Sequence, residues 1–129
     1  MIKFSIITVC LNAGQDLIDT VENTLNQSYD NFEIIVKDGF SKDGSIEKIP
    51  NDERVRLIQK KDTGIYDAMN QGIEAATGDY LIFMNCGDWF YDSSVLERID
   101  AAIKEKQEMC YYGLCYNRKL DSINAYPKK

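Results

Sequence analysis

Residues 60–91 constrain the fold of this chain more than any other stretch of its sequence. After Gly64, apolar residues recur at helical spacing as far as Thr77-Gly78, a pair that is typical of a helix end. An apolar run of strand length at 80–84 follows and leads directly into the polar residues 85–88. The continuous run predicts a strand that is buried on both faces, as in a parallel sheet. Ligands of such sheets bind in the crevice beyond the carboxyl ends of the strands.

The rest of the chain repeats this alternation of strand and helix. Further strand patterns lie at 3–11, 32–36, 54–59 and 109–116, and further helical patterns lie at 15–27, 46–49 and from a capping box at Ser94 onward. The pattern at 54–59 alternates as an edge strand does. Because the connections are short, we expect one α/β domain over residues 1–129, with a mostly parallel, Rossmann-like sheet and helices on both faces.

Composition excludes several functional classes. A net charge of −6 gives no basic surface for nucleic acid, and the absence of histidine removes His-based triads and His zinc ligands. No apolar run reaches 18 residues, so a transmembrane helix is excluded within this sequence. The cysteines lack metal-finger spacing, and we expect reduced thiols in a cytoplasmic protein. They are Cys10, Cys86, Cys110 and Cys115.

Polar side chains collect at the ends of the predicted strands and beside the helix that follows Gly64. These candidate site residues are Thr8, Asn12, Asp38, Asp62, Asp67, Asn85 and Asp88. Phosphate-cradling motifs are missing, since there is no G-x-x-x-x-G-K-[ST] and no G-x-G-x-x-G after the first strand. A P-loop nucleotidase and an NAD-type dehydrogenase are therefore both disfavoured. From the residues alone, Asn12 and Asp88 are also compatible with helix capping.

Four segments resemble successive motifs of the family 2 glycosyltransferases, in that family's order and spacing. The segments are SIITVCLN, VKDGFSKDGS, KDTGIYDAMNQGIEAATGDYLIF and MNCGDWF, and the similarity extends over about residues 3–117. The resemblance implies the nucleotide-sugar-binding half of a GT-A fold. It also implies transfer of a sugar, typically from a UDP-sugar, to a saccharide or lipid-linked acceptor in polysaccharide or cell-surface glycan synthesis.

The resemblance assigns roles residue by residue. Thr8 and Asn12 match the first-strand motif at the nucleotide, and Asp38 matches a carboxylate that accepts a hydrogen bond from the base. Asp62 and Asp67 match positions that border the base and ribose. Asn85 and Asp88 belong to the motif of the D-x-D type, in which Asp88 is the expected ligand of a divalent metal, Mg²⁺ or Mn²⁺. This motif is less acidic than in most of the family, because Asn85 and Gly87 stand where Asp is commoner.

The catalytic base of the family lies in an acceptor-side segment, and we do not expect it within these residues. An alternative function is therefore a non-catalytic nucleotide-sugar-binding or assembly module. The expected partners are a donor and a glycan or lipid-linked acceptor, with peripheral association at the inner face of the membrane as an option. Tyr111, Tyr112 and Tyr116 predict an aromatic surface that favours a homo-oligomer.

Overall fold

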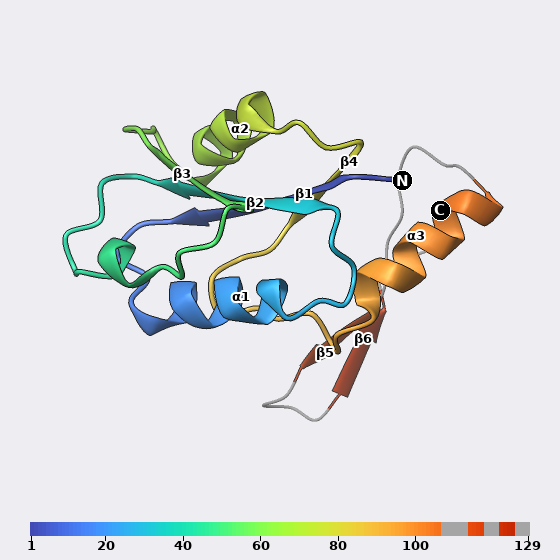
Figure 1. Ribbon diagram of the computed structural model, residues 1–129. Helices are drawn as coiled ribbons and strands as arrows, with labels where there is room; N and C mark the ends of the chain where they lie inside the picture. The colour runs from blue at the N-terminus through green and yellow to red at the C-terminus, as the bar shows by residue number, and fades with distance from the viewer. Residues whose placement is uncertain (107–113, 118–121, 126–129) are drawn as a thin grey trace.

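The computed structural model describes residues 1–106, 114–117 and 122–125. Three α-helices, one short 3₁₀ helix and six strands lie in these ranges (Figure 1). In chain order they are β1 (Phe4–Cys10), α1 (Gln15–Leu25), β2 (Phe32–Asp38), η1 (Ile46–Lys48), β3 (Val55–Gln59), α2 (Ile65–Ala75), β4 (Tyr80–Phe83), α3 (Val95–Glu105), β5 (Leu114–Asn117) and β6 (Ser122–Ala125). No helix within the described ranges is long and apolar enough to cross a membrane.

Strands β1 to β4 form one parallel sheet in the order β3-β2-β1-β4. The register places Cys10 of β1 beside Asp38 of β2, and Asp38 beside Gln59 of β3, so three strands end together. Helices α1 and α2 cover opposite faces of the sheet, with the carboxyl ends of the strands at the left of Figure 1. The predicted α/β fold with helices on both faces is therefore confirmed.

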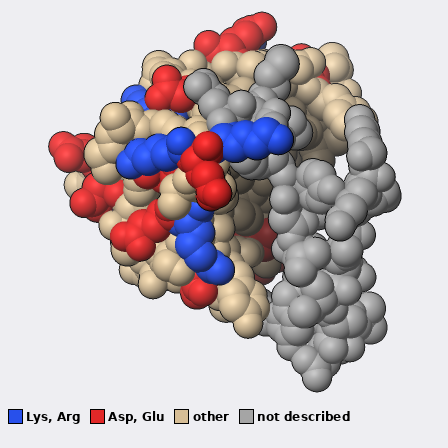
Figure 2. All heavy atoms as spheres, turned by 90° about the vertical axis from the view of Figure 1, so that its right-hand side faces the viewer, with Lys and Arg blue, Asp and Glu red and all other residues tan. Residues whose placement is uncertain are grey.

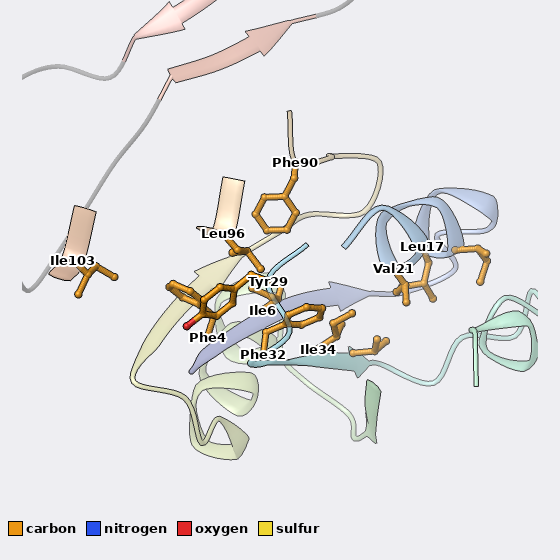
Figure 3. Packing of buried hydrophobic residues seen from close by; sticks show 12 residues of the cluster. Phe4, Ile6, Leu17, Val21, Tyr29, Phe32, Ile34, Phe90, Leu96 and Ile103 are labelled. Carbon is orange, nitrogen blue, oxygen red and sulfur yellow. The ribbon is translucent and has the colours of Figure 1, made fainter. Parts of the chain in front are cut away.

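The main apolar core lies between one face of the sheet and the helices α1 and α3 (Figure 3). Phe4 and Phe32 at the start of their strands meet Tyr29, and the rings of Phe4 and Tyr29 contact edge to face with centroids 5.4 Å apart. Leu96 and Ile103 of α3 close the cluster. Each such buried side chain contributes about 1.5–3 kcal/mol relative to an exposed position.

The face that carries α2 combines close packing with polar contacts. Gly72 of α2 lies so close to β1 that a Cβ atom there would be 2.5 Å from Cγ2 of Ile7. Nearer the amino ends of the strands, the buried Glu33 carboxylate accepts hydrogen bonds from the Ser5 hydroxyl at 2.6 Å and the Thr77 backbone amide at 2.7 Å. This carboxylate therefore ties β1 and β2 to the turn that precedes β4.

Two predictions about the strands were wrong. Strand β4 is half exposed rather than buried on both faces, since Leu81 and Phe83 are 39% and 40% exposed. It is the edge strand of the sheet within the described residues, and α2 packs over β1 and β2 rather than over β4. The strand expected at 109–116 begins at Leu114 in its described part and pairs antiparallel with β6, not with the main sheet. The side chains of the three tyrosines predicted to form an aromatic surface lie outside the described residues.

The capping box predicted at Ser94 is also absent. Ser94 is the N-cap residue of α3, but its side chain makes no capping hydrogen bond. Its hydroxyl instead donates to Oδ1 of Asp92 at 2.8 Å, and its backbone amide donates to the same oxygen at 2.9 Å. An Asx turn at Asp92 therefore orders the chain before α3.

Candidate functional site

The loops that follow β1, β2, β3 and β4 are joined by hydrogen bonds at the carboxyl edge of the sheet. The amide of Gly39, just after β2, donates to the carbonyl oxygen of Cys10 at 3.1 Å. The amide of Lys60, just after β3, donates to the carbonyl oxygen of Asp38 at 3.1 Å. After β4, the thiol of Cys86 donates to the carbonyl oxygen of Val9 at 3.4 Å. These contacts bring the predicted site residues to one edge of the protein.

Asn12 connects the loops that follow β1 and β2. Its amide donates to the Ser41 hydroxyl at 2.8 Å, and its side-chain oxygen accepts from the Lys42 amide at 2.8 Å. Asn12 also has a positive φ of 53°, a conformation that Asn tolerates better than most residues. The N-cap position of α1 is occupied by Gly14, so Asn12 does not cap that helix. Its side chain is exposed at the carboxyl edge.

Asp38 is fully buried and saturated by contacts within the protein. Its carboxylate accepts from the hydroxyl of Ser41 at 2.5 Å, from the amide of Ser41 at 3.1 Å and from the side chain of Gln59 at 3.1 Å. Burial by itself raises the pKa of Asp38, but the bonds from Ser41 and Gln59 outweigh it and hold the pKa below its ordinary value. Asp38 is therefore an ionised anchor for the loop after β2.

Thr8 is buried directly behind this edge, and its hydroxyl has no hydrogen-bond partner. It is 1% exposed, and Oγ1 is one of two buried side-chain polar atoms without a partner in the described part of the chain. The other is Oε1 of Gln71 on α2. A buried hydroxyl without a partner costs free energy, so such a group is a candidate for a hydrogen bond to a bound ligand.

Asp62 and Asp67 lie on either side of the start of α2. Oδ2 of Asp62 is 2.9 Å from Nζ of Lys37, and its Oδ1 accepts from the amide of Gly64 at 3.2 Å. Asp67 accepts from the amide of Thr63 at 2.9 Å and so orders the loop before the helix. Both carboxylates are partly exposed, which leaves them within reach of a ligand at the carboxyl edge.

The loop after β4 presents Asn85 and Asp88 to solvent. Thr20 of α1 holds this loop, because its hydroxyl accepts from the amide of Gly87 at 2.8 Å and donates to the carbonyl oxygen of Asp88 at 3.0 Å. The carboxylate of Asp16 lies against the same loop, 3.4 Å from the position of a Cβ atom at Gly87. Asp88 therefore has a second carboxylate near its loop.

The side chains that the structure describes include no group of three His, Cys, Asp or Glu residues that could hold a metal ion. A cation of the Mg²⁺ type is commonly bound by one or two carboxylates, with water and substrate phosphate supplying the other oxygens. Asp88, with Asp16 beside its loop, fits that kind of donor set. Among the described residues, the arrangement fits a cation shared with a phosphate ligand.

The thiols of Cys10 and Cys86 also lie at this edge, and both cysteines are free. Burial, the largest cause, and the negative charges of Asp16 and Asp88 together raise the pKa of Cys86 to about 11. Burial and the charge of Asp38 likewise raise the pKa of Cys10. Neither thiol is activated as a nucleophile, in agreement with the expectation of reduced cysteines at these two positions.

A separate hollow of the described surface lies at the opposite end of the sheet. It has a volume of about 830 Å³, and Lys and Arg side chains mix with acidic ones on this face (Figure 2). Its two arginines are paired within the protein, Arg56 with Glu33 at 2.7 Å and Arg54 with Asp52 at 3.1 Å. Both arginines of this hollow are thus engaged within the protein, and the predicted site residues lie at the carboxyl edge instead.

Sequence reasoning missed several residues that hold this edge. Ser41 and Gln59 bind Asp38, Thr20 and Asp16 contact the loop after β4, and Lys37 pairs with Asp62. A signal was available for Lys37, because a charged residue near the end of the apolar run FEIIVKD is unusual in a buried strand. Thr20 gave no such signal, since a threonine on a helix has no pattern that marks a loop contact.

The amino-acid sequence of this chain matches a protein family and several curated proteins. A family model described as "Glycosyl transferase family 2" matches residues 5–128. The chain is 35% identical over 109 residues to a PGL/p-HBAD biosynthesis glycosyltransferase of Mycobacterium tuberculosis, covering 81% of this chain and 43% of that protein. It is 32% identical over 127 residues to the glycosyltransferase GlyG of Streptococcus pneumoniae, covering 95% and 42%. The chain thus spans less than half the length of these curated relatives.

Solved structures share the fold at lower sequence identity. The S. aureus TarS fragment 1–349 in complex with UDP-GlcNAc matches with a TM-score of 0.73 and 24% identity, over 80% of this chain and 31% of that one. The mannosyltransferase PcManGT of Pyrobaculum calidifontis, in complex with GDP-Man and Mn²⁺, matches with a TM-score of 0.67 and 20% identity, over 78% and 32%. The GT-A fold expected from the sequence is therefore confirmed for the described part of the chain.

Proposed function

Because this chain belongs to glycosyl transferase family 2, we propose that the carboxyl edge of its sheet binds the nucleotide of a UDP-sugar. The sugar is transferred to a saccharide or lipid-linked acceptor in the synthesis of a polysaccharide or cell-surface glycan. One observation carries the proposal: the loops after all four parallel strands are hydrogen-bonded into a single edge that contains the predicted site residues. This is the edge at which open α/β sheets bind ligands.

In this proposal Thr8, Asn12 and Asp38 form the pocket of the base. The buried Thr8 hydroxyl gains a partner when the pocket is filled, which repays the cost of leaving it unpaired. A ring N–H of the base takes the place of one of the donors that Asp38 has in the ligand-free protein. The exposed Asn12 side chain borders the same pocket.

Asp62 and Asp67 border the base and ribose in the proposed complex. Ionised carboxylates accept hydrogen bonds from hydroxyl groups, and charge-assisted bonds of this kind are shorter and stronger than neutral ones. Both carboxylates lie at the start of α2, where contacts with Lys37 and Thr63 fix their positions. Their partly exposed oxygens leave room for ribose hydroxyls.

Asn85 and Asp88 are proposed to meet the diphosphate, with Asp88 as the protein ligand of Mg²⁺ or Mn²⁺. A divalent cation there neutralises the negative charge that develops on the leaving phosphate. The chain itself supplies the fixed loop: the Thr20 hydroxyl holds both Gly87 and Asp88 by their backbones. Asn85 is neutral, so it binds phosphate oxygen through its amide N–H without adding negative charge.

The test is titration calorimetry with UDP, GDP and ADP in the presence of Mn²⁺. UDP should bind most tightly. GDP is included because one structural neighbour was solved with GDP-Man and another with UDP-GlcNAc. Asp62→Asn should weaken UDP binding about tenfold, or about 1.4 kcal/mol. Asp30→Asn is the matched control, because Asp30 is exposed at the amino end of the sheet and should leave binding unchanged. Equal or absent binding of all three nucleotides would refute the proposal.

A second function remains as an alternative because Asn85 and Gly87 replace acidic residues in the motif after β4. A motif with Asp88 as its one carboxylate suits a module that binds a nucleotide sugar without transferring it. Release of UDP from UDP-sugars, measured with the full-length protein and a panel of glycan acceptors, separates the two. Tight UDP binding without any release of UDP would favour the binding module.

A further inference from the structure

Lys37 places a charged side chain at full burial within the sheet. It lies in β2, and both the residue and its side chain are 0% exposed. Its ammonium group contacts three oxygens: the carbonyl of Lys60 at 2.7 Å, Oδ2 of Asp62 at 2.9 Å and the carbonyl of Asp38 at 3.5 Å. Burying an ammonium ion is costly unless it is paired and hydrogen-bonded, so these contacts are a requirement of the fold.

The three contacts converge on the carboxyl edge from within the protein. The carbonyls of Asp38 and Lys60 mark the ends of β2 and β3, and Asp62 belongs to the loop that leads into α2. The Asp62 carboxylate also approaches the chain after β2, since a Cβ atom at Gly39 would lie 3.2 Å from its Oδ2. Lys37 thus holds Asp62 beside the residue that follows Asp38.

The ion pair leaves Asp62 available to solvent while fixing its position. Its side chain is 19% exposed, although one oxygen contacts Lys37 and the other accepts from the amide of Gly64. The hydrogen bond from Lys37, the largest cause, lowers the pKa of Asp62 below its ordinary value. Asp62 is therefore both ionised and immobile at the edge where Asp38 contributes a second negative charge.

We infer that Lys37 is a positioning residue of the nucleotide site, which orients Asp62 toward the nucleoside and offsets one negative charge at an edge that must receive an anionic diphosphate. The inference rests on the proposed function, because that function assigns Asp62 to the ligand. Lys37 itself is buried and touches no ligand. A purely structural lysine would join β2 to β3 without any effect that passes through Asp62.

A double-mutant cycle separates these two roles. The variants are Lys37→Met, Asp62→Asn and both together, with the dissociation constant of UDP measured by calorimetry in Mn²⁺ at neutral pH. If Lys37 acts through Asp62, each single variant binds UDP about tenfold more weakly, and the double variant is no worse than either. If Lys37 is only structural, the losses multiply to about a hundredfold or Lys37→Met binds as the wild type does, and the inference is overturned.

The pH dependence provides a readout that a structural role would not move. Without Lys37 the pKa of Asp62 returns toward the ordinary value for Asp, about 3.9, so the binding deficit of Lys37→Met should grow as the pH falls from about 6 to about 4. Titration of the UDP phosphate cancels in the ratio to wild type, and the neighbouring Asp38 and Asp67 are the same in every variant. The double variant, compared with Asp62→Asn alone, should show no such growth. A deficit of Lys37→Met that stays constant with pH would contradict the inference.

Folding of the variants is checked by circular dichroism before any titration. The double variant removes both charges of the pair, so it should fold even where Lys37→Met alone leaves Asp62 without its cation. If neither variant folds, Lys37 is a determinant of folding and not a positioning residue, and the inference fails. If wild type binds no nucleotide, the proposed function fails together with it. Wild-type UDP binding with multiplicative losses overturns the inference alone.

Discussion

Replacing Glu33 with glutamine will measure how strongly one buried carboxylate holds this sheet together. The Glu33 side chain is 6% exposed, and Oε2 accepts from Ser5 and from both the amide and the hydroxyl of Thr77. Its other oxygen, Oε1, accepts from Arg56 at 2.7 Å. A glutamine amide presents an NH₂ group to one of these sets of donors, so at least one hydrogen bond is lost together with the charge.

The pKa of Glu33 gives the magnitude of the effect. Burial alone raises the pKa, but the bonds from Ser5, Thr77 and Arg56 outweigh it and lower the pKa from 4.5 to about 2. At about 1.4 kcal/mol for each pKa unit, the ionised carboxylate stabilises the fold by about 3 kcal/mol. Because the pKa is lowered on folding, this stabilisation is complete above about pH 4.5 and is lost as the pH falls toward about 2.

Urea denaturation of wild type and Glu33→Gln across this pH range is the assay. At neutral pH the variant should have a free energy of unfolding about 3 kcal/mol lower, and the difference should shrink steadily below about pH 4.5. Glu53→Gln is the control, since Glu53 is exposed at the same end of the sheet and should change stability by less than about 0.5 kcal/mol. A difference below about 1 kcal/mol at neutral pH, or one that does not vary with pH, would refute the reasoning.

Three further predictions concern packing, metal and thiols. Gly72→Ala should lower the free energy of unfolding by about 1–3 kcal/mol in urea, because the added Cβ overlaps Ile7 and either α2 or β1 must move; an unchanged midpoint would contradict this contact. Asp88→Asn should weaken Mn²⁺-dependent UDP binding about tenfold in calorimetry while binding in EDTA is unchanged, whereas lost thermal stability with intact binding would make Asp88 structural. Cys86, with a pKa of about 11, should react with iodoacetamide far more slowly at pH 8 than in urea-unfolded protein, as followed by peptide mass spectrometry; equal rates would rule out its burial beside Asp16.

The sequence alone determined the order of the elements and the edge at which they meet. Helix α2 begins at Ile65 after Gly64, as the apolar periodicity predicts, and β2 begins at Phe32 as predicted but extends to Asp38, two residues beyond the predicted end. These features depend on neighbouring residues, because hydrogen bonds within a helix and alternation along a strand are local. The parallel arrangement then follows from short right-handed crossovers, and with it the common edge that carries Asn12, Asp38 and Asp88.

Only the tertiary structure decided which of these side chains are buried, paired or exposed. The apolar run of β4 predicts burial on both faces, but the position of the strand beyond β1 leaves Leu81 and Phe83 exposed. Asp38 faces inward and is saturated by Ser41 and Gln59, and nothing in its local sequence distinguishes it from the exposed Asp88. Their environments differ because burial and charge pairing depend on residues that are distant in the chain, which only the packed sheet brings within hydrogen-bonding distance.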